Sequence, residues 1–275
     1  MTARTGHDGA SPSGVPARIA RRVADAVLYR DRSCAAPGER PGTLVPPGRP
    51  EEEGTSWSLT ECLLERAQDA SVHLCLRFLH LRRCGVERAG TGAGEGTFLS
   101  CDETTEREVG ESFPLAVLLA GERTAEVNVP GDRFTERIRG PHGASEGRVI
   151  CEHLPLNATL TASAERLAGP YGLIRLRVLV RNTALLVGRE VPAEYALGRS
   201  LLSAHLIVET GCGGFVSLAD PPEWAGPFAR ACRNEHTWPA LVGEPGHRDV
   251  VLSSPVVLPD HPDDPAQAGD EEAIA

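Results

Sequence analysis

The sequence predicts an α+β fold in which antiparallel β-strands outweigh a few short helices. Residues 72–78 (VHLCLRF) and 173–180 (LIRLRVLV) alternate apolar and polar side chains, which is typical of half-buried strands. Further strand-like runs follow one another with few helical segments between them, and this favours antiparallel pairing over βαβ winding. We therefore expect a single β-rich domain over residues 17–258, with two subdomains that divide near residues 168–170 as an alternative.

The N-terminal part of the chain predicts one helix between two unstructured segments. Residues 1–16 are polar and rich in Gly, Ser and Pro, so we expect a disordered N-terminus. Residues 17–29 place apolar side chains at helical spacing with arginines on the other face; a strand over residues 26–29 is the competing interpretation. Residues 34–56 hold five Pro and four Gly in 23 positions without any period, and we expect disorder there too.

Order is expected to return at Trp57. The alternating strand at residues 72–78 continues past Arg83, and a glycine-rich stretch at residues 90–96 separates it from a second apolar run at residues 97–103. This arrangement predicts two strands joined by a flexible loop.

The middle of the chain contains shorter apolar segments. Residues 114–120 and 148–153 are apolar runs, and the charged residues 131–147 between them read as a polar loop. Residues 156–167 fit either a strand or a short helix. Residues 173–180 form the clearest strand in the sequence, because Ile174, Leu176, Val178 and Val180 fall on one face, with Arg175 and Arg177 on the other.

The C-terminal part predicts a hairpin, a helix and two last strands. Residues 201–209 and 214–218 flank the turn sequence TGCG and suggest a hairpin. Asp220 is a favoured N-cap for a helix that restarts at Pro227 and ends near Asn234. Two last strands are expected at residues 238–242 and 250–258. Residues 259–275 are expected to form a solvated acidic tail.

Composition excludes several classes of function. The chain has 275 residues, 38 acidic and 28 basic side chains and a net charge of −10, and every basic residue is Arg. The absence of Lys excludes lysine Schiff-base chemistry, and the acidic balance argues against a nucleic-acid or anionic-membrane partner. Residues 1–16 lack the apolar segment of a secretory signal, so we expect a cytoplasmic protein.

Eight cysteines occur without any Cys-x-x-Cys pair. In a cytosolic chain of this length, most of them are expected to be reduced and to serve as small apolar core residues. The strong zinc and redox spacings are absent from the sequence.

Two motif-like stretches do not have the context that their chemistry requires. Ser145 lies in a G-x-S-x-G pattern, but a serine nucleophile of that type needs a strand-to-helix turn, and here a loop is followed by a strand-like run. The glycines of residues 90–96 lack the register and the Lys of a phosphate-binding loop. We expect neither a catalytic residue nor a bound cofactor at these places.

Cys232 and His236 are the candidate metal ligands. They are four residues apart, so on a helix they would share one face. His205, Cys212 or His247 would supply further ligands if the fold brings them close, and Cys151 with His153 forms a second, weaker pair. The alternative interpretation is a buried Cys beside a surface His.

Segments rich in Pro, Trp and acidic residues near the C-terminus are candidates for protein interaction. An exposed Trp beside two prolines can act as a binding hot spot, although such a Trp more often serves packing. The candidate residues are Asp220, Pro221, Pro222, Glu223, Trp224, Trp238, Asp260, His261 and Pro262.

Several segments occur in a characteristic order along the chain. They are VADAVLY (23–29), TECLLE (60–65), GPYGLIRLRVLVRNT (169–183), SLLSAHLIV (200–208), FVSLADPPEWA (215–225) and the DVVLSSP and DHP elements. Through these segments, which extend over most of the chain from Val23 to Pro262, the sequence resembles an uncharacterised family of actinobacterial proteins encoded beside nickel–iron hydrogenase genes.

The resemblance implies hydrogenase accessory or maturation work, with a hydrogenase subunit or a maturation factor as the partner and no active site to transfer. Residues 30–56 depart from the family, whose members continue with Tyr-rich strands at this place. Our leading hypothesis is therefore a non-catalytic accessory protein that acts by protein–protein interaction. The alternative is a metal-handling protein or metalloenzyme that uses Cys232 and His236.

Overall fold

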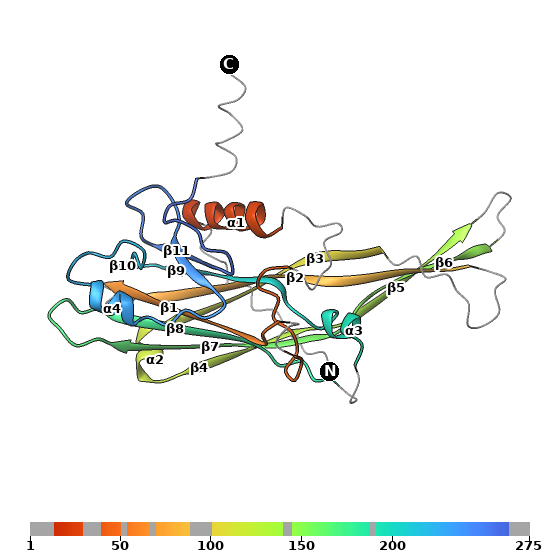
Figure 1. The fold of residues 1–275 in the computed structure, drawn as a ribbon, viewed down its shortest axis with the longest axis horizontal. Helices are drawn as coiled ribbons and strands as arrows, with labels where there is room; N and C mark the ends of the chain where they lie inside the picture. The colour runs from red at the N-terminus through yellow and green to blue at the C-terminus, as the bar shows by residue number, and fades with distance from the viewer. Residues whose placement is uncertain are drawn as a thin grey trace, which may run out of the picture.

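The computed structural model describes residues 14–29, 40–50, 54–65, 70–88, 101–139, 145–186 and 191–263. Two antiparallel β-sheets pack against each other, and the helices lie at their periphery (Figure 1). The predicted fold class, α+β with mainly antiparallel β-structure, is confirmed.

The first sheet has five strands among the described residues, in the order β10–β1–β8–β7–β4. Their bounds are β1 Trp57–Glu65, β4 Arg123–Val129, β7 Leu156–Arg166, β8 Ile174–Asn182 and β10 Gly214–Val216.

The second sheet, over the same described residues, has the order β11–β12–β9–β2–β6–β5, and β3 pairs with the other edge of β2. Its strands are β2 Ser71–Arg88, β3 Cys101–Pro114, β5 Asp132–Arg139, β6 Ser145–His153, β9 Leu202–Thr210, β11 Trp238–Leu241 and β12 Val250–Ser254. The helices are α1 Val15–Leu28, α2 Leu115–Ala120, α3 Ala193–Leu197 and α4 Gly226–Ala231.

The main hydrophobic core lies between the two sheets. Alternate residues of β8 point into it, as the sequence pattern predicted, and Leu206 and Val208 of β9 reach it from the opposite sheet. Residues 168–170 form the turn between β7 and β8, which pair directly, so this turn does not separate two subdomains. The inward residues of β8 are Ile174, Leu176, Val178 and Val180.

Strand β2 is buried on both faces along its first half, and not on one face as predicted. Leu74 points into the core between the sheets, whereas Cys75 points to the opposite side, where α1 covers the sheet. The buried residues of α1 recur at helical spacing, and Pro16 stands in its first turn, where a missing backbone N–H is tolerated. The helix predicted from residue 17 is therefore confirmed against the competing strand at residues 26–29, and it begins two residues earlier, within the N-terminal segment that was expected to be disordered.

Ion pairs join α1 to the second sheet. The Arg21 guanidinium donates to Glu108 of β3 at 2.7 Å, and Arg77 of β2 lies 2.9 Å from Asp25. Arg77 is only 5% exposed and also pairs with Glu106 and Glu108. These ion pairs reinforce the orientation of α1 that its buried apolar stripe already sets.

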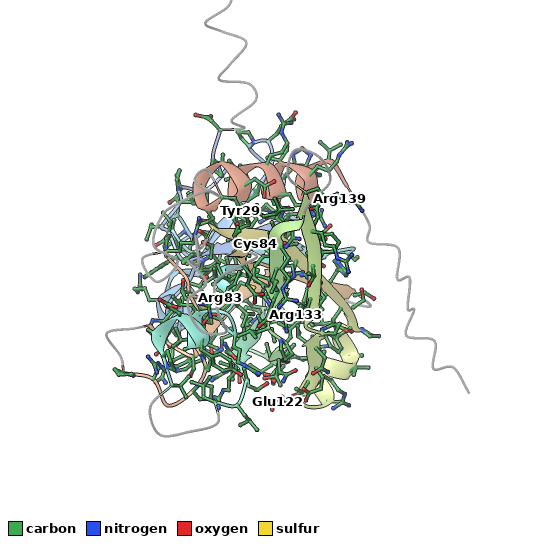
Figure 2. All side chains as sticks on the ribbon, turned by 90° about the vertical axis from the view of Figure 1, so that its right-hand side faces the viewer. Tyr29, Arg83, Cys84, Glu122, Arg133 and Arg139 are labelled. Carbon is green, nitrogen blue, oxygen red and sulfur yellow. A yellow bond between two sulfur atoms is a disulfide. The ribbon has the colours of Figure 1, made fainter. Side chains whose placement is uncertain are left out.

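The second half of β2 continues past the sandwich as an arm made of β3, β2, β6 and β5 (Figure 1). The strand has 18 residues, which at 3.4 Å each gives about 60 Å. It pairs with β9 up to Leu79 and with β6 from Arg82 onward. Figure 2, seen from the side of the arm, shows Arg133 and Arg139 along the exposed strand β5.

The prediction of a polar loop over residues 131–147 is wrong, because most of this segment belongs to a β-ribbon. Strand β5 pairs with β6, and β4 pairs with β7, so the four strands form one ribbon that leaves the first sheet and joins the second. Nearly every side chain of β5 is exposed. A strand solvated on both faces has no apolar alternation, which explains why the sequence pattern missed it.

The prediction of disorder over residues 34–56 is wrong for its described part, residues 40–50 and 54–56. Leu44 exchanges two backbone hydrogen bonds with Leu201, and the Val45 N–H donates to Thr55. Leu44 and Val45 are buried, so two apolar residues between the prolines suffice to anchor the segment. Residues 30–39 and 51–53, with the rest of the N-terminal prediction and residues 264–275 of the tail, lie outside the described residues.

Two further predictions for the C-terminal part need correction. Residues 201–209 and 214–218 do not form a hairpin: β9 pairs with β2 and β12, whereas β10 pairs with β1 in the other sheet. The predicted helix starts later than Asp220 and stops at Ala231. The two last strands pair with each other as expected for neighbouring segments.

Candidate functional site

The residues predicted for protein interaction lie on a short connection that precedes α4. Asp220, Pro222 and Glu223 are exposed, and Pro221 is partly so. Trp224 follows them and packs against a small cluster on the outer side of the first sheet, made by Leu63, Leu173, Val216, Ala225 and Ala229. The chain thus exposes an acidic turn that contains two prolines, and the Trp that follows this turn packs on the apolar cluster beneath it.

Tyr171, from the turn between β7 and β8, completes this surface. Its ring centroid lies 4.5 Å from that of Trp224 with an interplanar angle of 30°, and Tyr171 is 52% exposed. Such a ring pair is worth about 0.5–1.5 kcal/mol beyond its buried area. We refer to Tyr171, Trp224 and residues 220–223 as the Trp224 surface.

Asp260 connects the Trp224 surface to the second sheet. Its Oδ2 accepts a hydrogen bond from Ser217 Oγ, and its Oδ1 accepts one from the backbone N–H of Leu241 at 2.8 Å. Ser217 Oγ in turn accepts from the backbone N–H of Asp220 at 2.7 Å. A carboxylate that receives donors from both segments fixes the turn relative to β11.

His261 and Pro262 follow Asp260 in the irregular segment after β12. The His261 backbone N–H donates to Leu241 at 2.8 Å, and its Nδ1 lies 3.1 Å from the Gly243 carbonyl oxygen. Asp260 and His261 therefore attach this segment to β11 and to the turn that follows β11. Trp238, on β11, is 43% exposed and makes no ring contact with Trp224.

The expectation that Cys232 and His236 share a helical face is wrong. Helix α4 ends at Ala231, Cys232 is extended and His236 has a positive φ of 63°, so the two residues do not lie one helical turn apart. The rings of His236 and Trp57 meet edge to face, with centroids 5.1 Å apart and an interplanar angle of 84°. Burial, with the nearby Glu61 carboxylate, raises the pKa of Cys232 to about 11. No group of three His, Cys, Asp or Glu residues that could hold a metal ion is found within the described ranges.

Glu61, which the sequence pattern did not single out, explains the position of residues 232–236. It is buried, accepts the backbone N–H of Arg233 at 2.8 Å and lies 3.5 Å from Arg177 Nη1. The Glu61 N–H donates to Asn234 Oδ1 at 2.8 Å. A buried carboxylate with these donors has a structural role here, because it ties the segment after α4 to β1.

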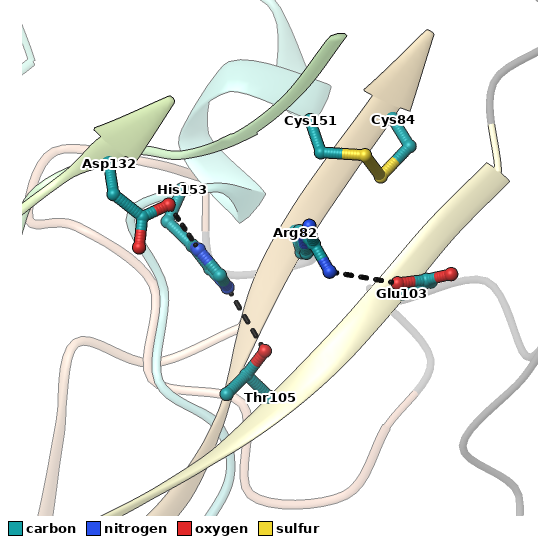
Figure 3. Close-up of a disulfide and its surroundings, with 7 residues drawn as sticks. All are labelled: Arg82, Cys84, Glu103, Thr105, Asp132, Cys151 and His153. Atoms are coloured by element: carbon teal, nitrogen blue, oxygen red, sulfur yellow. Dashed lines mark hydrogen bonds and ion pairs between the residues drawn. A yellow bond between two sulfur atoms is a disulfide. The ribbon is translucent and has the colours of Figure 1, made fainter. Parts of the chain in front are cut away.

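A second polar cluster, also missed by the sequence analysis, lies where the ribbon changes sheet (Figure 3). His153 contacts Asp132 Oδ1 through Nδ1 at 2.8 Å and Thr105 Oγ1 through Nε2 at 3.0 Å. The neighbouring His80 is fully buried, and its Nε2–H donates to the Leu154 carbonyl at 2.9 Å. The cluster therefore holds the two segments of the ribbon, the β4–β5 and β6–β7 connections, together at its corner and connects them to β2 and β3.

Most cysteines were expected to be reduced, and among the described residues Cys84 and Cys151 are the exceptions, because they form a disulfide. It joins directly opposed residues of β2 and β6 near the corner (Figure 3). Cys62, Cys75, Cys212 and Cys232 are free, and the first two are buried in the predicted manner. His205, Cys212 and His247 lie in contacts of their own and not in a shared ligand group within the described ranges.

The buried histidines predict a pH dependence of stability. Burial lowers the pKa of His80 to about 4 and that of His205 to about 3. The unfolded chain, with His pKa values of about 6.5, therefore binds more protons than the folded chain below that pH. The contribution of the two neutral histidines to the free energy of unfolding should therefore be fully present above pH 6.5. It should be lost as the pH drops toward 4, by up to about 1.4 kcal/mol per pH unit for each His.

Urea denaturation between pH 7 and 4.5 measures this slope. The double variant His80→Gln, His205→Gln should show a clearly flatter dependence than the parent chain. An unchanged slope would show that these two groups do not carry the effect.

Comparison with known proteins adds no family assignment. No family model and no curated protein matches this chain. Among the described residues, no helix has the length and apolar character needed to cross a membrane.

Proposed function

We propose that this chain is a non-catalytic accessory protein of a nickel–iron hydrogenase system, and that it acts by binding a hydrogenase subunit or a maturation factor. The sequence resemblance supports the hydrogenase setting. The observation that carries the binding role is the Trp224 surface, in which an exposed Tyr and a Trp stack beside an acidic turn.

The construction of this surface suits recognition of a folded partner. Trp224 packs against the cluster of Leu63 and Leu173, and Asp260 fixes the preceding turn. Rigid aromatic side chains lose little conformational entropy on binding, and Trp and Tyr are the residues most enriched at interface hot spots. Asp220 and Glu223 would form an acidic rim that favours a partner with a basic patch.

Titration calorimetry with purified proteins tests the proposal. The full chain is titrated separately with the hydrogenase subunits and the maturation factors encoded by the same gene group. Saturable binding at a fixed stoichiometry to one of them is expected. Absence of heat with all of them, at concentrations up to 100 μM and at two temperatures, would contradict the proposed function.

A further inference from the structure

Strand β5 is an open edge of the arm. It pairs with β6 on one side, and no other strand of the described chain pairs with it. Within the described ranges, no residue outside β6 forms a backbone hydrogen bond with β5. An open edge carries a row of unpaired N–H and C=O groups, to which a further strand can add.

The strand register shows which residues of β5 direct their backbone groups to the open edge. The Cα atoms of Cys84 and Cys151 are 4.1 Å apart, the close spacing of a pair that exchanges no backbone hydrogen bonds. The backbone groups of Cys151 therefore face β5, and Phe134, which lies opposite Cys151, bonds to β6. Because this direction alternates along a strand, every second residue of β5 faces the open edge instead. These residues are Arg133, Thr135 and Arg137.

The residues that face the open edge also carry positive charge. Arg133 and Arg137 are exposed and lie on one face of β5, since they are an even number of residues apart. Arg139 follows them beyond a shift in the pairing register with β6 (Figure 2). None of the three arginines has a hydrogen bond or an ion pair with another described residue. Their guanidinium groups are thus free to bind carboxylates.

The neighbouring strand does not cancel this charge. On the same face of β6, Glu152 lies opposite Arg133, and Arg148 lies opposite Arg137. Arg148 forms an ion pair with Glu87 of β2. The unpaired charge along this edge is therefore positive, although the whole chain has a net charge of −10.

The opposite face of β5 offers apolar contacts. Phe134 is 54% exposed, Ile138 is partly exposed, and Glu136 lies between them. A strand with alternating acidic and apolar side chains would place its carboxylates opposite the arginines. Its apolar side chains would then lie beside Phe134 and Ile138, as cross-strand neighbours on one face do.

A second copy of β5 is a poor partner for this edge. The two twofold antiparallel pairings that use most of the strand place Arg133 opposite Arg137 or Arg139 of the other copy. Like charges directly opposite each other destabilise a strand pair. A nucleic acid would match the charges but would leave the row of backbone N–H and C=O groups unpaired, whereas an extended peptide matches both.

We propose that β5 docks an extended acidic segment of a partner protein, which adds to the arm as a further strand. The carboxylates of this segment pair with Arg133, Arg137 and Arg139, and its backbone pairs with β5. The Trp224 surface has an acidic rim and suits a partner of the opposite charge. Substitutions in β5 are therefore expected to leave binding at the Trp224 surface unchanged.

Fluorescence anisotropy with labelled peptides tests this docking. The probe is a fluorescein-labelled peptide of eight residues in which Glu and Val alternate, and it is titrated with the full chain at pH 7 in 50 mM NaCl. Saturable binding is expected.

N-methylated forms of the probe separate backbone pairing from charge attraction. The Glu residues lie opposite Arg133 and Arg137, so their amide groups would face β5, and methylation of these amides should abolish binding. Methylation of the Val amides, which would face away from β5, should leave the affinity within about threefold.

Charge variants locate the site. The double variant Arg133→Glu, Arg137→Glu should bind the probe roughly tenfold more weakly or worse, because two attractive cross-strand pairs become repulsive. The control is Arg166→Glu, Arg181→Glu, which reverses the same charge at exposed positions of β7 and β8. It should bind the probe as the wild type does.

Absence of saturable binding to the wild-type chain would overturn the proposal. Equal affinity for the two methylated probes would also overturn it, because the contact would then be charge attraction without strand addition. The same holds for an equal loss of affinity in the two double variants, and for dimerisation of the chain alone that Arg133→Glu, Arg137→Glu alters, which would assign the edge to a second copy. The methylated probes are measured on the wild-type chain, so their result stands even if a variant fails to fold.

Discussion

Replacing Asn182 by Ala should destabilise the protein by about 3 kcal/mol, because it leaves two buried backbone groups without partners at about 1–3 kcal/mol each. Asn182 is fully buried at the end of β8. Its Nδ2 donates to the carbonyls of Leu44 and Arg199, and its Oδ1 accepts the N–H of Ala184, each at 2.9 Å. Leu44 keeps a second donor, the Leu201 N–H, so the loss concerns Arg199 and Ala184.

Urea denaturation gives the change in unfolding free energy, and limited digestion with thermolysin, which cleaves before Leu, gives its location. Because Asn182 anchors Leu44, cleavage between Thr43 and Leu44 should become faster in the variant. Asn128→Ala, at an exposed position of β4, is the control and should stay within about 0.5 kcal/mol of the wild type. A loss below 1 kcal/mol for Asn182→Ala would show that the anchor is not important for stability.

Gly131→Ala should destabilise the corner of the ribbon by about 2–3 kcal/mol, in the range of overpacked sites. A Cβ at this position would lie 2.8 Å from the His153 carbonyl oxygen and 2.9 Å from Pro155 Cδ. One group is a backbone atom and the other belongs to a rigid proline ring, so neither can move aside by itself. The β4–β5 and β6–β7 connections of the ribbon must therefore separate. The hydrogen bond from His153 to Asp132, next to Gly131, is expected to be lost at the same time.

Gly211→Ala is the matched control for this substitution, since a Cβ at Gly211 meets no heavy atom within 4 Å. The two variants are compared by urea denaturation under one set of conditions. Equal stabilities would mean that the close approach at the corner does not constrain the fold.

The parts of the fold that the sequence predicted are those in which local pattern and burial coincide. Strand β8 alternates because one of its faces lies in the core, and α1 shows helical spacing because one stripe covers β2. Strand β5 gave no signal, since both of its faces are solvated in the arm. The hairpin prediction at residues 201–218 failed for a different reason. The sequence there does form a turn, but the chain crosses from one sheet to the other at this turn, so the two strands do not pair.

The candidate site was predicted in part for the same reason. Trp224 and the neighbouring prolines were recognisable from the local composition of the sequence. The ring of Tyr171, which contacts Trp224, comes from the β7–β8 turn about 50 residues earlier in the chain. Only the topology of the fold brings the two rings together. The Cys84–Cys151 pair depends likewise on the register of β2 and β6, which residue spacing does not encode. Cys232 and His236 show the reverse error, because their spacing has meaning only on a helix and α4 ends before them.

The affinity of single-site variants for the partner found by calorimetry tests the role of the Trp224 surface most directly. Tyr171→Ala is compared with Phe134→Ala, which removes an aromatic ring of similar exposure, 54% against 52%, from strand β5 of the arm. Tyr171→Ala should weaken binding by roughly tenfold or more, as expected for a hot-spot residue, and Phe134→Ala should leave it within about twofold. Unchanged affinity in Tyr171→Ala, or an equal loss in both variants, would contradict the assignment of binding to this surface.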